Sequence, residues 1–164
     1  MKRIACYIVI AILLAGCGSR EGSSEKSKEG AALEKKDLMA EGRHYLLTGD
    51  YARAIEAFKA QTLQNPQDSK AYFIMGQTYM HIGDCQSAIE SFKTVTALDP
   101  NNGPAYLLLG GCHDLKGNKD EAIANVGKSI VIFDKNKDVK NFKRSVVILR
   151  SLTKSKESEE SEVQ

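Results

Sequence analysis

Apolar residues recur at helical spacing through the middle of the chain, on both sides of short polar turns. In the central stretch, one side of a first predicted helix is formed by Tyr72, Met75, Gly76, Tyr79 and Ile82. One side of a second predicted helix is formed by Ala88, Ile89, Phe92 and Val95. Between them lies Gly83-Asp84, in which the glycine suits a left-handed helix end and the aspartate suits the start of the next helix. The pattern therefore predicts pairs of helices joined by tight turns.

The same pattern returns at a fixed interval along the chain. The glycines Gly42, Gly76 and Gly110 are 34 residues apart. The same spacing separates Gly49, Gly83 and Gly117, then Ala54, Ala88 and Ala122, then Tyr45, Tyr79 and His113, and then Phe58, Phe92 and Val126. Small residues let two helices approach closely, and large rings fill the space around that contact. A constant period of this length predicts a protein built of stacked units.

These positions resemble the tetratricopeptide repeat family over residues 35 to 134. The resemblance implies an all-α fold, a right-handed superhelix of about three helix hairpins. The implied repeats are at about 35–68, 69–102 and 103–136. The chain departs from the family at Leu38, where tryptophan is favoured, at Glu41, which takes a usually apolar place, and in the third unit at His113, Val126 and Asp134. Terminal repeats differ in this way when one flank faces solvent or a cap.

A further helix is predicted after the third unit, from about 138 to 154. Its apolar stripe would consist of Val139, Phe142, Val146, Leu149 and Leu152. Its other face carries Lys140, Lys143, Arg144 and Arg150. We interpret this helix as a cap over the open flank of the third unit; a basic face that meets acidic lipid or a protein is the alternative. Residues 155–164 are predicted to be disordered because they are almost entirely polar.

The start of the chain has the pattern of an export signal. Lys2 and Arg3 precede an unbroken apolar stretch that runs from Ile4 to Ala15. As a helix, this stretch would reach only about 18 Å, whereas the hydrocarbon core of a bilayer is roughly 30 Å thick. Residues 1–16 are therefore predicted to be a signal peptide, and a short anchor helix is the alternative.

A second resemblance concerns Leu14-Ala15-Gly16-Cys17, which is similar to a bacterial lipobox. It implies that Cys17 carries acyl chains such as palmitate and holds the protein on a membrane of the cell envelope. Residues 17–30 would be the lipidated cysteine and a flexible linker, followed by a repeat domain at 31–154. Gly18 is not the aspartate that often marks retention in the inner membrane. The expected location is the periplasmic leaflet of the outer membrane in a cell with two membranes, and otherwise the outer face of the cytoplasmic membrane.

Charge and motifs exclude several classes of function. The formal charge of +2 comes from Lys2 and Arg3, which the signal peptide would remove, so the mature chain is expected to be neutral and not to bind nucleic acid. No phosphate-binding loop or nucleophile elbow is present in the sequence. His44, His81 and His113 have no second histidine three or four residues away, which argues against a metal site. We therefore expect neither an enzyme nor a cofactor.

Two cysteines remain in the predicted repeat domain. Cys85 opens the second helix of unit two, and Cys112 lies late in the first helix of unit three. The up-and-down course of the chain would bring both to the same end of the stack. In an oxidising envelope they could form a disulfide, and the alternative is two small packed residues.

In the tetratricopeptide family the first helices of successive units line a concave groove. The resemblance implies a partner-binding groove at Met39, Arg43, Leu46, Phe73, Gln77, Met80, His81, Leu107, Gly111 and Asp114. The paired Lys and Asn with which some members hold a terminal carboxylate have no counterpart here. The expected ligand is an extended or helical apolar segment of another protein. We therefore predict an envelope adaptor or scaffold, for example in pilus or secretin assembly. A self-assembling structural lipoprotein and a regulatory subunit of an envelope enzyme are the alternatives, and the oligomeric state stays open.

Overall fold

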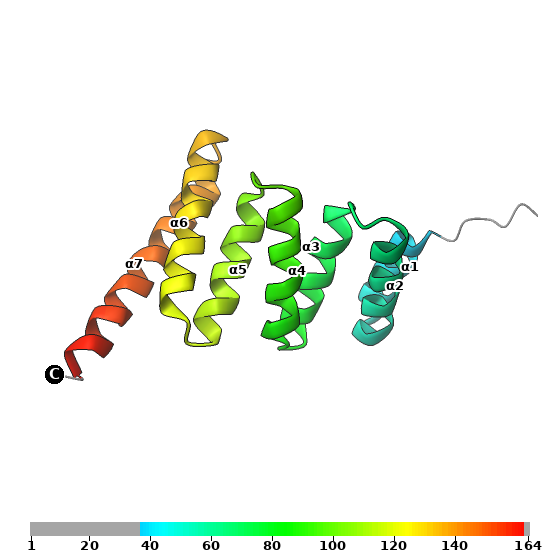
Figure 1. Cartoon of the computed structure of the whole chain (residues 1–164), viewed down its shortest axis with the longest axis horizontal. Coiled ribbons are helices and arrows are strands. Elements are labelled where there is room, and N and C mark those ends of the chain that lie inside the picture. The colour runs from blue at the N-terminus through cyan, green and yellow to red at the C-terminus, as the bar shows by residue number, and fades with distance from the viewer. Residues whose placement is uncertain (1–36, 163–164) are drawn as a thin grey trace, which may run out of the picture. The chain divides into compact units, whose positions relative to one another are not determined.

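The computed structural model describes residues 37–162, with side chains as far as Glu157. The predicted signal peptide, Cys17, the linker and residues 31–36 of the predicted repeat domain lie outside the described residues. Within the described range the chain forms α1 (Leu38–Thr48), α2 (Tyr51–Gln64), α3 (Ser69–His81), α4 (Cys85–Leu98), α5 (Gly103–Leu115), α6 (Lys119–Lys135) and α7 (Val139–Glu162). Each helix packs against the next one along the chain (Figure 1). None of the described helices is long and apolar enough to cross a membrane.

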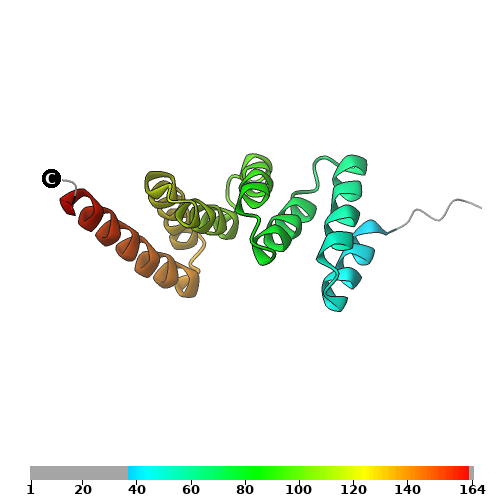
Figure 2. The same cartoon turned by 90° about the horizontal axis from the view of Figure 1, so that it is seen from below.

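The three predicted hairpins are confirmed as α1 with α2, α3 with α4, and α5 with α6. Successive hairpins turn relative to one another along the row (Figure 2). The turn glycines Gly49, Gly83 and Gly117 have φ of 78°, 81° and 77°, a left-handed conformation that side chains disfavour. The residue after each glycine stands at the start of the next helix. Asp84 caps its helix by accepting a hydrogen bond from the Ser87 amide at 3.0 Å, whereas the Asn118 side chain caps no amide.

The second helices differ in length because of proline. α2 and α4 each have 14 residues and end just before Pro66 and Pro100, whose rings disfavour helical backbone in the preceding residue. In the third unit Asp134 stands in the place of the proline, and α6 runs for 17 residues. The longer α6 provides the surface on which α7 packs.

The core of each hairpin depends on a glycine that faces a large side chain. A Cβ atom added at Gly76 would lie 2.8 Å from Cε1 of Phe92, which is fully buried. The same arrangement places Gly42 against Phe58 and Gly110 against Val126. Because no side chain separates the paired helices at these points, the large side chains of the second helix reach the backbone of the first.

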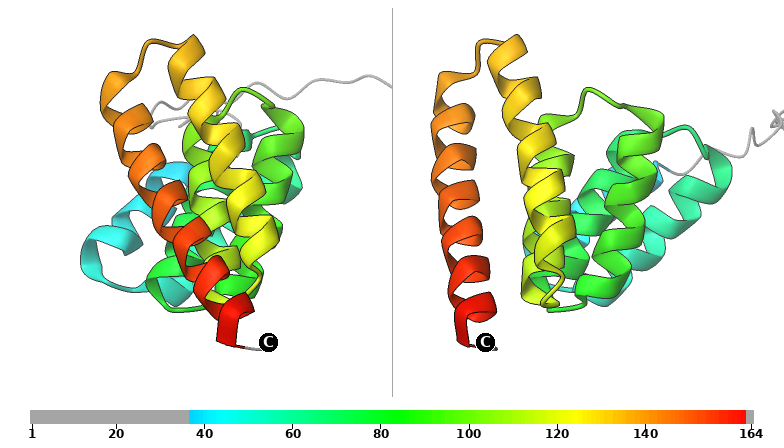
Figure 3. Two further views of the ribbon diagram at one scale, coloured as in Figure 1. Left: turned by 90° about the vertical axis from the view of Figure 1, so that its left-hand side faces the viewer. Right: turned by 60° about the vertical axis from the view of Figure 1, so that its left-hand side comes forward.

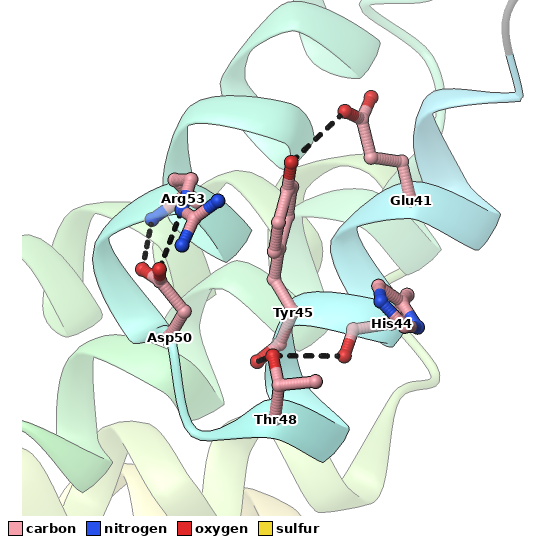
Figure 4. A network of polar contacts seen from close by, with 6 residues as sticks. All are labelled: Glu41, His44, Tyr45, Thr48, Asp50 and Arg53. Atoms are coloured by element: carbon pink, nitrogen blue, oxygen red, sulfur yellow. Dashed lines mark hydrogen bonds and ion pairs between the residues drawn. The ribbon is translucent and has the colours of Figure 1, made fainter.

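Hydrogen bonds in the first hairpin explain its unusual Glu41. The Tyr45 hydroxyl donates to Oε1 of Glu41 at 3.4 Å, and the Arg53 guanidinium lies 4.9 Å from the Tyr45 ring centroid (Figure 4). Asp50 begins α2 by accepting bonds from the Arg53 backbone amide and side chain, and these bonds lower the pKa of Asp50. A carboxylate at Glu41 is therefore tolerated because a tyrosine hydroxyl on the same helix meets it.

The capping helix is confirmed, but two details of its prediction are wrong. First, α7 continues to Glu162, so residues 155–162 are helical and not disordered. No glycine or proline follows Val139, and the Lys156 ammonium pairs with the Asp120 carboxylate at 2.5 Å, which ties this part of α7 to the first turn of α6.

Second, the packed face of α7 overlaps the predicted stripe at Leu149 and Leu152 but is rotated toward Ser145 and Ile148. Figure 3 shows α7 lying beside α6. The buried residues are Ser145 and Leu152, with Ile148 and Leu149 partly buried, whereas Val139 is 58% exposed. The Ser129 hydroxyl lies 3.2 Å from the Ser145 hydroxyl and bonds the Val126 carbonyl. These two small residues allow a close approach of α6 and α7, which rotates the packed face away from the predicted stripe.

Candidate functional site

The residues predicted to line the groove come from α1, α3 and α5, the first helices of the three hairpins. Arg43, Gln77 and His81 are exposed. The half-buried members are Met39, Leu46, Phe73, Met80, Leu107 and Asp114. An open surface therefore exists on these helices, but several of its predicted apolar residues also serve the core.

Phe73 and Leu107 show this double role most clearly. The Phe73 ring packs edge-on against Phe92, with centroids 5.8 Å apart. Leu107 belongs to the cluster that α7 closes with Leu152. Substitution of either residue would disturb folding as well as binding, so neither is a clean probe of the groove.

An open pocket of about 650 Å³ lies between α1 and the beginning of α3. It is lined by Asp37, Met39, Ala40, Arg43, His44, Leu47, Asp68 and Lys70. The two aspartates are engaged as helix caps, because Asp37 accepts from the Ala40 amide and Asp68 from the Ala71 amide. Arg43 and Lys70 form no salt bridge within the described part of the chain. The pocket thus combines apolar side chains with two cations and two aspartates, and neither cation is paired with an acid in a salt bridge.

Two exposed leucines were missed by the sequence analysis. Leu47 is 88% exposed and Leu115 is 72% exposed. They are separated by two periods and correspond to His81 in the middle unit, so the register itself could have identified them. The equivalent place is thus exposed in all three units, as Leu47, His81 and Leu115.

His81 does not stand alone on this surface. Its ring lies 4.4 Å from the ring of Tyr51, the first residue of α2. The side chain therefore links the second hairpin to the first. Asp114 is also engaged, since its Oδ1 accepts from the Lys119 ammonium at 2.8 Å.

Two adjacent glycines in α5 have opposite surroundings. A Cβ at Gly110 would lie 2.7 Å from Cγ2 of Val126, whereas a Cβ at Gly111 would have no neighbour within 4 Å. Gly111 corresponds in register to Arg43 and Gln77. A side chain introduced at Gly111 would therefore extend into open space beside the predicted groove.

The helix pairs and their surface agree with comparisons to known proteins. Two models described as tetratricopeptide repeat match residues 39–102 and 83–143, and together they span more than half of the chain. This chain is a tetratricopeptide repeat protein. No curated protein matches its sequence.

Solved tetratricopeptide structures share the fold at low sequence identity. The type III secretion translocator chaperone SycD of Yersinia enterocolitica is 20% identical with a TM-score of 0.68, covering 73% of this chain and 83% of that chain. PcrH in complex with the chaperone binding region of PopD is 19% identical with a TM-score of 0.68, covering 73% and 90%. The first TPR of Spaghetti (RPAP3) bound to an HSP90 peptide is 16% identical with a TM-score of 0.63, covering 72% and 89%.

His113 takes the place of a packing tyrosine of the tetratricopeptide family, and the structure confirms that it is buried. Burial lowers its pKa; the charges of Lys93 and Lys116 act in the same direction, and Glu121 opposes them. Asn118 Nδ2 lies 3.5 Å from its Nδ1. The folded state therefore favours the neutral imidazole.

This shift makes stability depend on pH. Because the pKa of His113 is lower in the folded state, the unfolded chain binds its proton first as the pH falls through about 6.5, and the free energy of unfolding should decrease. Urea denaturation between about pH 7.5 and about pH 5.5 would measure the decrease. A His113→Tyr variant should show a smaller pH dependence, and an unchanged dependence would contradict this origin.

Cys85 and Cys112 lie in adjacent hairpins, and both are free thiols in the structure. Burial raises the pKa of Cys112 to about 12, and the charge of Cys85 and a hydrogen bond between the two side chains add to the shift. Cys112 is thus a protonated, poorly nucleophilic thiol near neutral pH. Disulfide exchange would have to begin at Cys85.

The disulfide stays a prediction that protein chemistry can test. If the pair is oxidised in the envelope, exported protein purified without reductant should have neither Cys85 nor Cys112 available to maleimide in denaturant. Both should react after reduction. Reaction of both cysteines before reduction would instead assign them to packing alone.

Within the described residues, no group of three histidine, cysteine, aspartate or glutamate side chains is placed to hold a metal ion.

Proposed function

We propose that this tetratricopeptide repeat protein is a lipoprotein adaptor of the bacterial envelope. Lipid on Cys17 holds it on a membrane, and α1, α3 and α5 bind an extended or helical apolar segment of a partner protein. In a cell with two membranes the anchor lies in the periplasmic leaflet of the outer membrane. The partner belongs to an assembly such as a pilus or secretin.

One observation carries the binding part of this proposal: Leu47 and Leu115 are exposed at equivalent positions of α1 and α5. Next to Leu47, the open pocket exposes Met39 between the cations Arg43 and Lys70. A segment with apolar residues and one acidic side chain matches this combination, because a carboxylate beside the pocket would pair with Arg43 or Lys70.

Two structurally similar proteins support peptide binding as the mode of action. PcrH holds the chaperone binding region of PopD, and the first TPR of Spaghetti holds an HSP90 peptide. Both bind a segment of a larger protein. A groove for such a segment needs only side chains that are already in place, so binding need not remodel the array.

The variant Gly111→Gln tests the groove. Its side chain should occupy the α5 part of the proposed binding surface without disturbing the core, since nothing lies within 4 Å of the Cβ position. Proteins crosslinked in cells to the wild-type chain should be lost from the variant. Gly127→Gln in α6 is the matched control, because its Cβ position is equally open and α6 is a second helix of its hairpin.

The two variants separate the competing functions. Capture of the same proteins by Gly111→Gln and by the wild type would remove the groove from the proposal. A second copy of the same chain as the main crosslinked species would favour the self-assembling structural alternative.

For the anchor, Cys17→Ser should abolish labelling by palmitate and release the protein from the membrane fraction, and persistent labelling would contradict lipidation at this residue.

A further inference from the structure

Positive charge is concentrated in one helix of the protein. Between residues 139 and 156, α7 contains six lysines and arginines and no acidic residue. Residues 37–138 contain 10 basic and 13 acidic residues, so the rest of the described array before α7 is slightly acidic. The basic character of α7 is therefore a local feature and does not follow from overall composition.

The charges gather on the side of α7 that faces away from α6. The exposed residues of this side are Lys140, Lys143, Arg144, Val147, Arg150 and Lys154. Their spacing places them opposite Ser145 and Leu152, which are buried against the array. Within the described side chains none of the five cations forms a salt bridge, although Lys156 on the flank pairs with Asp120. We call these six residues the outer face of α7.

The C-terminal end of α7 is acidic, because Glu157 is exposed one turn beyond Lys154 and three further glutamates follow it in the helix. Few acidic groups adjoin the outer face elsewhere. Asp138 precedes the helix and is near enough to Lys140 for that charge to contribute to its lowered pKa, although its hydrogen bonds with Asn141 contribute more. In the turn from α6 to α7, the charged neighbours are Asp134, Lys135 and Lys137, so the turn adds no net negative charge once Asp138 is counted. The outer face thus keeps its positive potential.

An apolar residue stands in the middle of these cations. Val147 is 67% exposed, between Lys143 and Arg144 on one side and Arg150 on the other. The apolar face of α7 packs on the array, so at a lipid surface the cations would supply most of the attraction and Val147 a small apolar contact. A helix that only solvates the end of an array needs no exposed valine at this position.

We propose that the outer face of α7 binds the surface of an anionic phospholipid bilayer. The outer face runs from Lys140 to Lys154, so it presents an edge of about 21 Å along α7 at the end of the array (Figure 3). A flat, negatively charged surface can meet all five cations at once and accept Val147 at the head-group boundary. This inference goes beyond adaptor function and does not depend on lipid at Cys17.

Vesicle flotation tests the proposal in the absence of the lipid anchor. Residues 36–164 form a compact unit, so the chain from Gly18 onward can be used without leader or lipid. It should float with vesicles of phosphatidylcholine and phosphatidylglycerol, and not with phosphatidylcholine alone. Added salt should weaken the binding because it screens the charges.

Neutralising variants locate the contact. Each basic residue near such a surface contributes roughly fivefold in affinity, so Lys143→Gln, Arg144→Gln and Arg150→Gln together should weaken binding about 100-fold. The control variant Lys59→Gln, Lys93→Gln and Lys116→Gln removes the same charge from exposed positions elsewhere. It should bind anionic vesicles nearly as the wild type does. Equal losses of vesicle affinity in both variants would overturn the proposal. A wild-type chain that does not bind anionic vesicles would overturn it as well, because the outer face would then only be solvated or bind an acidic protein.

A tryptophan probe gives an independent readout, because the natural chain contains no tryptophan. In Val147→Trp the emission should move to shorter wavelength when phosphatidylglycerol vesicles are added, as the ring enters the head-group region. Val131→Trp is the matched control, since Val131 is 69% exposed on the neighbouring α6. It should not shift. An unshifted Val147→Trp, or equal shifts in both variants, would contradict contact through the outer face.

Discussion

Replacement of Phe92 by alanine should lower the free energy of unfolding by about 3–5 kcal/mol. Phe92 is fully buried, and its ring fills the space between the Gly76 backbone and the Phe73 ring. The hole left behind has rigid backbone on one side, so it cannot easily collapse. Urea denaturation followed by circular dichroism measures the loss, and Phe142→Ala on α7 provides a half-buried comparison that should lose less.

A double-variant cycle shows whether Phe92 acts through Gly76. Gly76→Ala alone should be destabilising, because its Cβ would meet the Phe92 ring at 2.8 Å. In the Phe92→Ala background the ring is gone, so the same change should become neutral or stabilising as alanine favours the helix. Additive effects would contradict direct contact between the two positions.

Alanine at two neighbouring positions of α5 should have effects of opposite sign. Gly110→Ala should lower the free energy of unfolding by about 1–3 kcal/mol, since its Cβ would meet Val126 at 2.7 Å and the Ala122 carbonyl oxygen at 3.1 Å. Gly111→Ala should raise it by roughly 0.5–1 kcal/mol, because the new side chain lies in open space and glycine disfavours helix.

The comparison isolates packing from helix propensity. Both variants make the same chemical change in the same helix, one residue apart, so a propensity effect alone would stabilise both. Equal shifts in the urea midpoint would therefore contradict the close approach of α5 and α6 at Gly110. A stabilised Gly111→Ala would also establish that position as a safe place for the larger side chain used to test the groove.

Several features could be predicted from the sequence because they depend on residues within one hairpin. Gly83 and Asp84 end one helix and begin the next through contacts within a few residues. A glycine of the first helix meets a phenylalanine ring of the second in both units that have these residues, as Gly76 meets Phe92. The basic side of α7 was also predicted, since Lys140, Lys143, Arg144 and Arg150 are all exposed. The proposed groove was located only in part, because Phe73 and Leu107 are shared with the core.

The period along the chain determined the all-α class and the three hairpins, and the helical spacing of apolar residues after the third unit determined the existence of a cap. Only the tertiary structure decided how the packed face of α7 is rotated and where Ser129 meets Ser145. The physical reason is that a repeat pattern identifies equivalent positions, whereas burial depends on the neighbour that each position meets. Those neighbours differ at the two ends of the array, where α1 has no preceding hairpin among the described residues and α7 is the last described helix.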